Sequence, residues 1–471
     1  MFTVFHPEFA EMVRELHGQH VDFRHGKWDD DGMDRHQLER FRATLAYVRE
    51  RSPFYRERLE FVDPARIDSL SPEALADVPF TTKDDLRIAQ FDMLSRPMSD
   101  AWIFYETTGT TGASTPCPRD NVDSLHNNTA LTVHYETIFR QFGGSQVIGV
   151  SGPSELHATG DTFGDVCRNL GLAVAKMWPH SPMIGFERAF EVMRMLPITG
   201  LFCTPGMAMT LAKKAVAAGL DPVGDFSLDV LMLTGELASP SLLDNIGRTW
   251  GAKAYNALYA SQEASVLAAA GADGGLYTAP VINHYEVVDP TTLQPAPADT
   301  DGVRQGELVV TNLYQGAKPL VRYRTGDMVR MFPGDATATL PSPRVEILGR
   351  VRDRLVLNGV PVTGYDLENL LLRHVRDYLD YQVVIERTGD RDSITLILQG
   401  EFALDDPALA RTVEDCRTEL GVDVRVAFGD PGSITSTGAM VSWKAARVVD
   451  RRDDSTPELE AALALAERRG E

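Results

Sequence analysis

The chain has few cysteines, no long apolar stretch and fewer basic than acidic residues. Its 471 residues include four cysteines, Cys117, Cys167, Cys203 and Cys416, which are far apart and form no C-x-x-C pair. This spacing suits a reducing cytoplasm and disfavours a structural zinc site. No apolar run approaches the roughly 20 residues that span a bilayer, and the first residues lack the basic-then-apolar order of a signal peptide. We therefore predict a cytoplasmic protein with no membrane partner.

The excess of acidic over basic residues limits the kinds of partner that the protein can bind. With 46 basic and 67 acidic residues the formal net charge is −21, which argues against nonspecific nucleic-acid binding. It leaves room for a phosphate site, because such a site needs only local positive potential. A hydrophobic fraction of 43% is ordinary for a globular protein, and a chain of this length is expected to hold two or more cores.

Residues 107–115, TTGTTGAST, carry the most unusual chemistry in the sequence. Nine residues supply six hydroxyls and two glycines. Glycine allows close backbone approach to a ligand, and successive backbone N–H groups can form an anion-binding concavity. The stretch therefore predicts a loop that wraps nucleotide phosphates, although a flexible surface loop of small polar residues has the same composition. It is no Walker A motif, because no Gly-Lys-Ser/Thr follows.

Strands and helices alternate after this stretch. Apolar runs of strand length predict parallel βαβ units in a sheet covered on both faces. The predicted strands are residues 146–150, 198–203, 229–233 and 252–258, and the predicted helices are residues 122–142, 207–218 and 239–250. Residues 353–471 predict a small α+β unit. The fold class is therefore a large α/β domain followed by a small α+β domain.

Polar segments follow three of the predicted strands. They are Thr204-Pro205-Gly206, Thr234-Gly235-Glu236 and Tyr259-Ala260-Ser261-Gln262-Glu263. In open parallel sheets ligands bind beyond the carboxyl ends of the strands. Position and chemistry together predict a ligand site at this edge.

The string from Thr107 to Gly112 resembles the phosphate loop of the adenylate-forming superfamily, which includes acyl-CoA synthetases and adenylation domains. Ala113 stands where that family often has lysine. The segments SPFYR and VPFTTKDDLR earlier in the chain resemble those of the phenylacetate–coenzyme A ligase branch. The resemblance extends from about residue 52 to residue 450. It implies that ATP phosphates bind the residues Thr107, Thr108, Gly109, Thr110, Thr111 and Gly112.

Further motifs follow in the family's order. Thr234-Gly235-Glu236-Leu237 resembles a turn that lies along adenine, and residues 259–263 resemble Y-G-x-T/S-E. The resemblance implies that Gly235, Glu236, Tyr259, Ala260 and Ser261 line the nucleotide, with Tyr259 stacked on adenine. It also implies that Glu263 is catalytic and helps to hold Mg²⁺. Ala260 and Gln262 depart from the pattern. Core packing of Tyr259 and a helix-terminal charge at Glu263 are the structural alternatives.

The C-terminal motifs complete the resemblance. Tyr323-Arg324-Thr325-Gly326-Asp327 matches Y-R-T-G-D, and the carboxylate of Asp327 can accept both ribose hydroxyls after a tight turn. The resemblance makes Arg350 a second ribose ligand, Arg352 the interdomain hinge and Gly359 part of the acceptor channel. Lys444 falls at the family's catalytic lysine, although an exposed basic residue in a basic stretch is the alternative, and Trp443 replaces the preceding glycine.

The resemblance implies an ATP-dependent, AMP-forming ligase that releases pyrophosphate, with residues 1–351 as the adenylation domain and residues 352–471 as a mobile domain. The expected cofactors are ATP and Mg²⁺, and the expected partners are an aromatic or small carboxylic acid and coenzyme A. A carrier-protein thiol, a nitrogen acceptor and a nucleotide-binding regulator without turnover remain alternatives, and a homodimer is left open. We expect His157, Thr204 and Gly206 to line the acid pocket.

Overall fold

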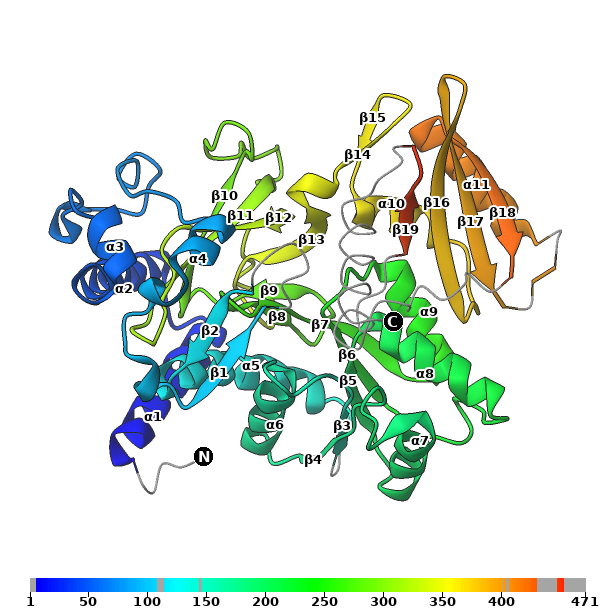
Figure 1. The fold of residues 1–471 in the computed structure, drawn as a ribbon, viewed down its shortest axis with the longest axis horizontal. Coiled ribbons are helices and arrows are strands. Elements are labelled where there is room, and N and C mark those ends of the chain that lie inside the picture. The colour runs from blue at the N-terminus through cyan, green and yellow to red at the C-terminus, as the bar shows by residue number, and fades with distance from the viewer. Residues whose placement is uncertain are drawn as a thin grey trace.

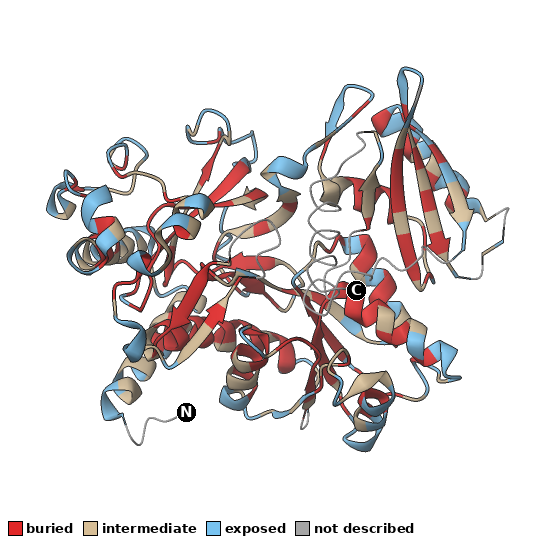
Figure 2. Ribbon diagram, in the orientation of Figure 1, coloured by how far each residue is buried: buried red, intermediate tan, exposed pale blue. Residues whose placement is uncertain are grey.

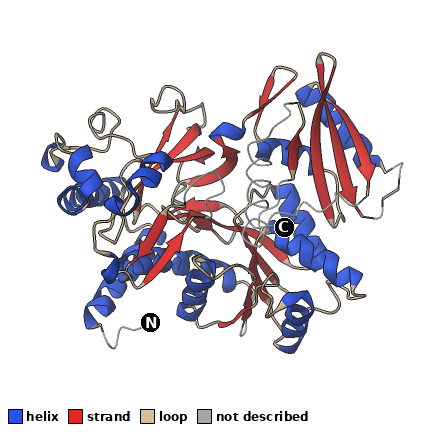
Figure 3. Ribbon diagram, in the orientation of Figure 1, coloured by secondary structure: helices blue, strands red, loops and turns tan. Residues whose placement is uncertain are grey.

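The computed structural model describes residues 6–107, 114–143, 146–400, 402–403, 406–429 and 447–452. These residues form a large sheet of eleven strands, a separate sheet of four strands and two short hairpins, with helices packed against both sheets (Figure 1). Along the large sheet the strand order is β10-β11-β12-β13-β9-β8-β7-β6-β5-β3-β4. Figure 3 shows how the helices flank the sheets, so the molecule is layered as the alternating pattern predicts.

The five strands from β7 to β4 form the parallel half of the large sheet. They are β3 (Val147–Val150), β4 (Ala173–Lys176), β5 (Gly200–Cys203), β6 (Val230–Thr234) and β7 (Lys253–Ser261). The helices of this half are α5 (Asn121–Phe139), α6 (Thr159–Asn169), α7 (Gly185–Met195), α8 (Pro205–Ala217) and α9 (Pro240–Trp250). Parallel neighbours need long crossover connections, and these helices supply them. The predicted α/β class with parallel βαβ units is confirmed.

The central parallel strands β5 and β6 are apolar on both faces because helices cover both. Leu201 and Leu231 pack in the core that contains α8 and α9. Phe202 and Met232, one position further along, pack in the core that contains α5 and α6. Successive side chains on a strand point to opposite faces, so each strand joins two cores. Figure 2 shows the buried residues concentrated along these strands.

The other half of the large sheet is antiparallel, which the sequence analysis did not predict. Its strands are β8 (Ser265–Ala270), β9 (Leu276–Thr278), β10 (Asn283–Val288), β11 (Arg304–Asn312), β12 (Tyr323–Phe332) and β13 (Arg344–Arg350). Antiparallel neighbours can be joined by turns or loops without a helix. The strand–helix alternation that revealed the parallel half is therefore absent here.

The N-terminal helices pack beside this antiparallel half. They are α1 (Pro7–Arg24), α2 (Asp30–Arg51), α3 (Pro53–Arg58) and α4 (Lys83–Ala89). Thr82 is the N-cap of α4, and its side chain and that of Asp85 form a reciprocal capping box. The hairpin of β1 (Ile103–Glu106) and β2 (Pro116–Arg119) follows, and its connection contains the predicted phosphate loop.

The remaining residues form the four-stranded sheet, in the order β18-β17-β16-β19. Its elements and the preceding hairpin are β14 (Leu355–Leu357), β15 (Val360–Val362), α10 (Gly364–Leu372), β16 (Asp380–Thr388), β17 (Arg391–Gln399), α11 (Pro407–Leu420), β18 (Asp423–Phe428) and β19 (Val448–Asp450). Apolar contact runs from Trp250 of α9 through Leu371 of α10 to Tyr381 of β16 in one core. The predicted boundary at residue 352 and the motion about it remain predictions.

Two further observations concern absences within the described ranges. None of the helices there is long and apolar enough to cross a membrane. Nor do the described His, Cys, Asp and Glu side chains gather in groups of three that could hold a metal ion.

Candidate nucleotide and acid site

The segments that follow the parallel strands lie together, as the sequence predicts. The Gly206 N–H after β5 donates to Glu236 Oε2 after β6, over 2.9 Å. The Thr234 hydroxyl donates to the Leu258 carbonyl of β7 over 2.8 Å. The Ser151 N–H, directly after β3, donates to a carbonyl of β5. One edge of the sheet therefore collects the turns after β3, β5 and β6.

Asp327 is the buried centre of a polar group on the neighbouring strands, whose Arg350 is partly exposed. The Tyr259 hydroxyl donates to Asp327 Oδ2 over 2.7 Å, and Arg350 Nε lies 3.1 Å from Asp327 Oδ1. Asp327 and Arg350 are direct partners across β12 and β13. The negative charge of Asp327 raises the pKa of Arg350, and burial followed by the same charge raises the pKa of Tyr259. Three predicted nucleotide ligands, far apart in sequence, thus meet.

The local backbone around Asp327 differs from the prediction. The sequence analysis placed Asp327 just after a tight turn, but Tyr323 to Asp327 begin strand β12. Gly326 has φ of +73°, and the pairing of β11 with β12 shifts register in this stretch. Glycine tolerates this left-handed backbone without a Cβ clash. A bulged strand, and no separate turn, presents the carboxylate.

The segment from Tyr259 to Glu263 was also predicted as a loop, and that is partly wrong. Tyr259, Ala260 and Ser261 are the last residues of β7, where a bulge shifts the pairing with β8. The Ser261 hydroxyl accepts from the Ala264 N–H over 3.0 Å, and Ala260 is exposed. Antiparallel pairing with β8 extends the strand past the point where the apolar pattern ends.

Glu263 is buried and bridges two groups that the sequence analysis did not assign to the site. Lys83 Nζ of α4 lies 2.7 Å from Glu263 Oε1, and the Tyr323 hydroxyl donates to the same oxygen over 2.9 Å. Burial alone would raise the pKa of Glu263, but the charge and the hydrogen bond of Lys83, together with further hydrogen bonds including that from Tyr323, outweigh burial and lower the pKa to about 2. Glu263 is therefore a buried, ionised carboxylate.

Lys83 could have been found only in part from the sequence. The Thr82 cap fixes Lys83 as the first residue of α4, which is a local signal. Its partner Glu263 is 180 residues away in the sequence, and no local sequence pattern indicates that contact.

The described part of the predicted phosphate loop is its base. The Thr107 N–H donates to the Thr115 carbonyl over 3.2 Å, and the Thr115 N–H donates back to Thr107 Oγ1 over 3.0 Å. The Glu106 N–H donates to the Leu156 carbonyl over 3.1 Å, which ties this base to the segment after β3. Thr108, Gly109, Thr110, Thr111 and Gly112 lie outside the described residues.

The three residues predicted for the acid pocket lie at the same edge. Thr204 is fully buried and caps α8, because its hydroxyl accepts from the Met207 N–H over 3.0 Å. Gly206 is in the first turn of α8. His157 Nδ1 lies 2.8 Å from the Thr159 hydroxyl. The cap gives Thr204 a structural function, and its place in a pocket wall stays a prediction.

The remaining predicted residues belong to other segments. Gly235 has φ of +88° in the turn after β6, and Gly359 has φ of +86° between β14 and β15. Arg352 is in a short 3₁₀ helix (Val351–Asp353), with Nε 3.4 Å from Asp353 Oδ1. Lys444 lies outside the described residues. The structure thus brings the residues of the large sheet together and leaves the hinge and the lysine untested.

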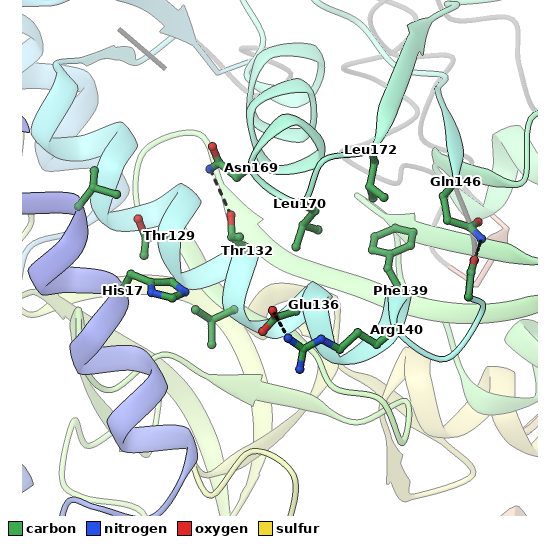
Figure 4. A pocket seen from close by; sticks show the side chains of 13 residues that line it. His17, Thr129, Thr132, Glu136, Phe139, Arg140, Gln146, Asn169, Leu170 and Leu172 are labelled. Atoms are coloured by element: carbon green, nitrogen blue, oxygen red, sulfur yellow. Dashed lines mark hydrogen bonds and ion pairs between the residues drawn. The ribbon is translucent and has the colours of Figure 1, made fainter. Parts of the chain in front are cut away.

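One cavity is unrelated to this edge. It has a volume of about 650 Å³ and lies among α1, α5 and the residues that precede β3 and β4 (Figure 4). Gln146 and Leu172 on its wall stand at the amino ends of their strands, and the Glu136–Arg140 ion pair closes one side. The predicted site residues take no part in this cavity.

Comparison with solved structures identifies the fold. The structure of 2-hydroxyisobutyryl-CoA ligase in the postadenylation state in complex with 2-HIB-AMP matches with a TM-score of 0.71 and 23% identity, over 92% of this chain and 91% of that chain. The same ligase with 2-HIB-AMP and CoA in the thioesterification state gives 0.63 and 24%, over 94% and 93%. The chain has the fold of the adenylate-forming acyl-CoA ligases. No family model matches it.

Curated relatives give the finer similarity. Phenylacetate-coenzyme A ligase of Pseudomonas putida is 28% identical over 441 residues, which cover 90% of this chain and 95% of that enzyme. The ligase of the same name from Thermus thermophilus is 29% identical over 455 residues, covering 88% and 96%, and that from Escherichia coli is 27% identical, covering 90% and 96%. The predicted resemblance to the phenylacetate–coenzyme A ligase branch of the adenylate-forming superfamily is confirmed.

Proposed function

We propose that this protein is an ATP-dependent ligase that activates a carboxylic acid as an acyl adenylate, releases pyrophosphate and transfers the acyl group to coenzyme A. The observation that carries the proposal is the joining of Tyr259, Asp327 and Arg350 beside the turns after β5 and β6. The curated relatives, which bear the name of such a ligase, support it over nearly the whole chain.

Asp327 is proposed as the ribose ligand. Its carboxylate has two acceptor oxygens, and Tyr259 and Arg350 already orient them, so little rearrangement is needed for two vicinal hydroxyls. Arg350 adds a donor beside them. Gly235 and Glu236 would lie along adenine, next to the face of Tyr259, Ala260 and Ser261. The backbone N–H groups and hydroxyls of residues 107–112 would then hold the phosphates.

Glu263 is proposed to hold Mg²⁺ and fits that function in its charge. It is ionised at neutral pH, and Mg²⁺ in nucleotide sites binds few carboxylates together with phosphate oxygens. When bound, the metal would neutralise charge on the phosphates. Lys83 already contacts the carboxylate, so this chain itself brings a second cation to the same place.

The proposed reaction asks mainly for positioning and charge stabilisation. The substrate carboxylate attacks the α-phosphorus and pyrophosphate leaves. The thiolate of coenzyme A then attacks the acyl carbonyl carbon and AMP leaves. Lys444 would place positive charge near the α-phosphate during the first step. Residues 352–471 would turn about Arg352 between the steps and bring Gly359 to the acceptor channel.

The proposed acid is aromatic or small. The relatives are named for phenylacetate, which supports an aromatic acid. His157, Thr204 and Gly206, which follow β3 and β5, would line the pocket for the acyl chain. The names of the same relatives support coenzyme A as the acceptor.

Purified protein, ATP, Mg²⁺ and coenzyme A are incubated with phenylacetate, benzoate, acetate and long-chain fatty acids in turn, and pyrophosphate and acyl-CoA are measured. We expect release of both with at least one aromatic or short-chain acid. ATP binding without turnover of any acid would favour the regulator. Turnover of long-chain fatty acids alone would contradict the proposed substrate class.

A further inference from the structure

A buried arginine connects the four-stranded sheet to the candidate site. Arg447 precedes β19, and its side chain is only 8% exposed. The guanidinium lies 3.6 Å from Glu236 Oε2 and 3.5 Å from Asp380 Oδ1, and 5.1 Å from the centre of the Tyr381 ring. We call Arg447, Glu236, Asp380 and Tyr381 the Arg447 cluster.

The positive charge of Arg447 is compensated by the acidic side chains of the cluster. Burial alone lowers the pKa of Arg447, but the neighbouring Tyr381, Glu236 and Asp380 outweigh burial and raise it. A charge this deep is tolerated only when it is paired. Removal of the cation would leave two buried carboxylates with less compensation.

Glu236 connects Arg447 to the turns at the edge of the large sheet where we propose that the ligands bind. The same oxygen, Oε2, accepts from the Gly206 N–H and faces the guanidinium. One carboxylate thereby fixes the turn after β5 relative to the turn after β6. These two turns contain the residues that we assign to the acid and to adenine.

Neighbouring contacts hold the two sheets in one arrangement around this cluster. Lys213 Nζ of α8 lies 3.1 Å from Asp380 Oδ2. The Ser239 N–H, at the cap of α9, donates to Glu368 Oε1 over 2.9 Å, and the Tyr381 hydroxyl donates to the other oxygen of Glu368. The cluster therefore depends on the placement of β16 and β19 against α8 and α9.

The contact between Arg447 and Glu236 is an ion pair without a hydrogen bond. At 3.6 Å it is longer than a hydrogen bond, and the buried Nε of Arg447 has no acceptor among the described residues. Coulombic attraction without a fixed hydrogen-bond geometry can be broken by a moderate displacement.

We propose that Arg447 is a positioning residue for adenylation. By pairing with Glu236 it holds the turns after β5 and β6 in the geometry that receives the acid and adenine. The contact exists only when the four-stranded sheet packs as it does here, and the proposed turn of residues 352–471 before acyl transfer would break it. The inference rests on the proposed function.

The test separates the two half-reactions. Single-turnover rates are measured for pyrophosphate release with the best acid of the panel, and for transfer from the chemically prepared acyl adenylate to coenzyme A. The variants are Arg447→Met, Arg447→Lys and Glu236→Gln, with the double variant Arg447→Met/Glu236→Gln. Arg451→Met is the matched control, because Arg451 is 61% exposed and pairs only with Glu386 among the contacts described.

Arg447→Met should slow adenylation by about 10²-fold, the cost of a small misplacement of reacting groups, and slow transfer less than about threefold. Arg447→Lys should recover part of the rate because it keeps the charge without the planar guanidinium. The double variant should lose less than the product of the single losses, because the partners act together. Arg451→Met should change neither step.

Equal losses in both half-reactions, or multiplicative losses in the double variant, would overturn the proposal. Hydrogen exchange gives a readout that needs no turnover. Folded Arg447→Lys protein should exchange faster than the wild type at residues 204–207 and 234–237, and unchanged exchange there would contradict the positioning function. A wild type that turns over no acid refutes the proposed function, and the exchange result still decides whether Arg447 positions these turns.

Discussion

The two halves of the large sheet present their candidate residues in different ways. In the parallel half, Thr204, Gly206 and Glu236 stand in turns beyond the ends of β5 and β6. In the antiparallel half, Asp327 and Arg350 stand within β12 and β13, and Tyr259 stands at the bulged end of β7 on the border. Turn residues are placed by the helix that follows, whereas strand residues are placed by the register of distant partners.

The two kinds of residue therefore depend on different contacts for their position. The turn after β5 is set by the Thr204 cap, so its position is built over a few residues. The Asp327 group needs three strands in register, and a bulge at Gly326 to aim the carboxylate. We expect substitutions in the antiparallel half to affect binding of the ribose, and those in the turns to affect the acid, adenine and the approach of the second sheet.

The largest effect is expected from a residue outside both halves. Lys444→Ala should lower adenylation by roughly 10²–10³-fold, the scale for the loss of one preorganised charge stabiliser. Transfer from a supplied acyl adenylate should fall far less, since Lys444 is proposed to act only in the first step. Single-turnover kinetics of each step, after circular dichroism has verified folding, provides the measurement. No loss in either step would remove Lys444 from the site, and equal losses would refute the alternation of the small domain.

Asp327→Ala tests the antiparallel half. Loss of a charge-assisted hydrogen bond costs about 1.5–3 kcal/mol, so ATP affinity should fall roughly 10- to 150-fold. Titration calorimetry with ATP measures it, and Asp273→Ala, in the exposed turn between β8 and β9, is the control. A folded variant with unchanged ATP affinity would place the ribose elsewhere.

Acid pH should loosen the helix that joins the two halves. His134 of α5 contacts the Ala269 carbonyl of β8. Burial lowers the pKa of His20 to about 3 and the pKa values of His126 and His134 to about 4. The unfolded chain binds these protons near pH 6.5, so below that pH it gains protons that the folded protein does not.

Each of the three histidines should therefore lower the free energy of unfolding by about 1.4 kcal/mol per pH unit as pH falls from 6.5 to 4. Burial raises the pKa of Asp123 to about 8, so this carboxyl contributes in the opposite direction over the same pH range. Urea unfolding between pH 7 and pH 4.5 measures the slope. His134→Asn should reduce this slope by the contribution of one histidine, which binds one proton on unfolding. An identical slope in this variant would show that His134 is already protonated in the folded state.

The smallest effect concerns the loop between β1 and β2. Saturating ATP should slow hydrogen exchange at residues 107–111, because their N–H groups would face the phosphates. Exchange at residues 299–303, in the turn before β11, serves as an internal control. Unprotected residues 107–111 in ATP-saturated protein would mean that the phosphates bind another segment.

The sequence predicted the parallel half because β3, β5 and β6 are each followed by a helix, and a capping residue such as Thr204 marks the start of α8. It missed the antiparallel half, where hairpins follow one another with no helix to mark them. Asp327 was found by motif, but its contact with Tyr259 spans 68 residues and depends on bulges that no local pattern reveals. Lys83 and Arg447 were missed as site residues because their partners Glu263 and Glu236 are also far away in the sequence.

The central claim is that this site forms an acyl adenylate. Acid-dependent exchange of labelled pyrophosphate into ATP tests it most directly, because exchange requires reversible adenylation and no acceptor. We predict exchange with phenylacetate or another aromatic or small acid, none without acid, and a strong reduction in Asp327→Ala. Protein that binds ATP yet supports no exchange with any acid of the panel would contradict the claim.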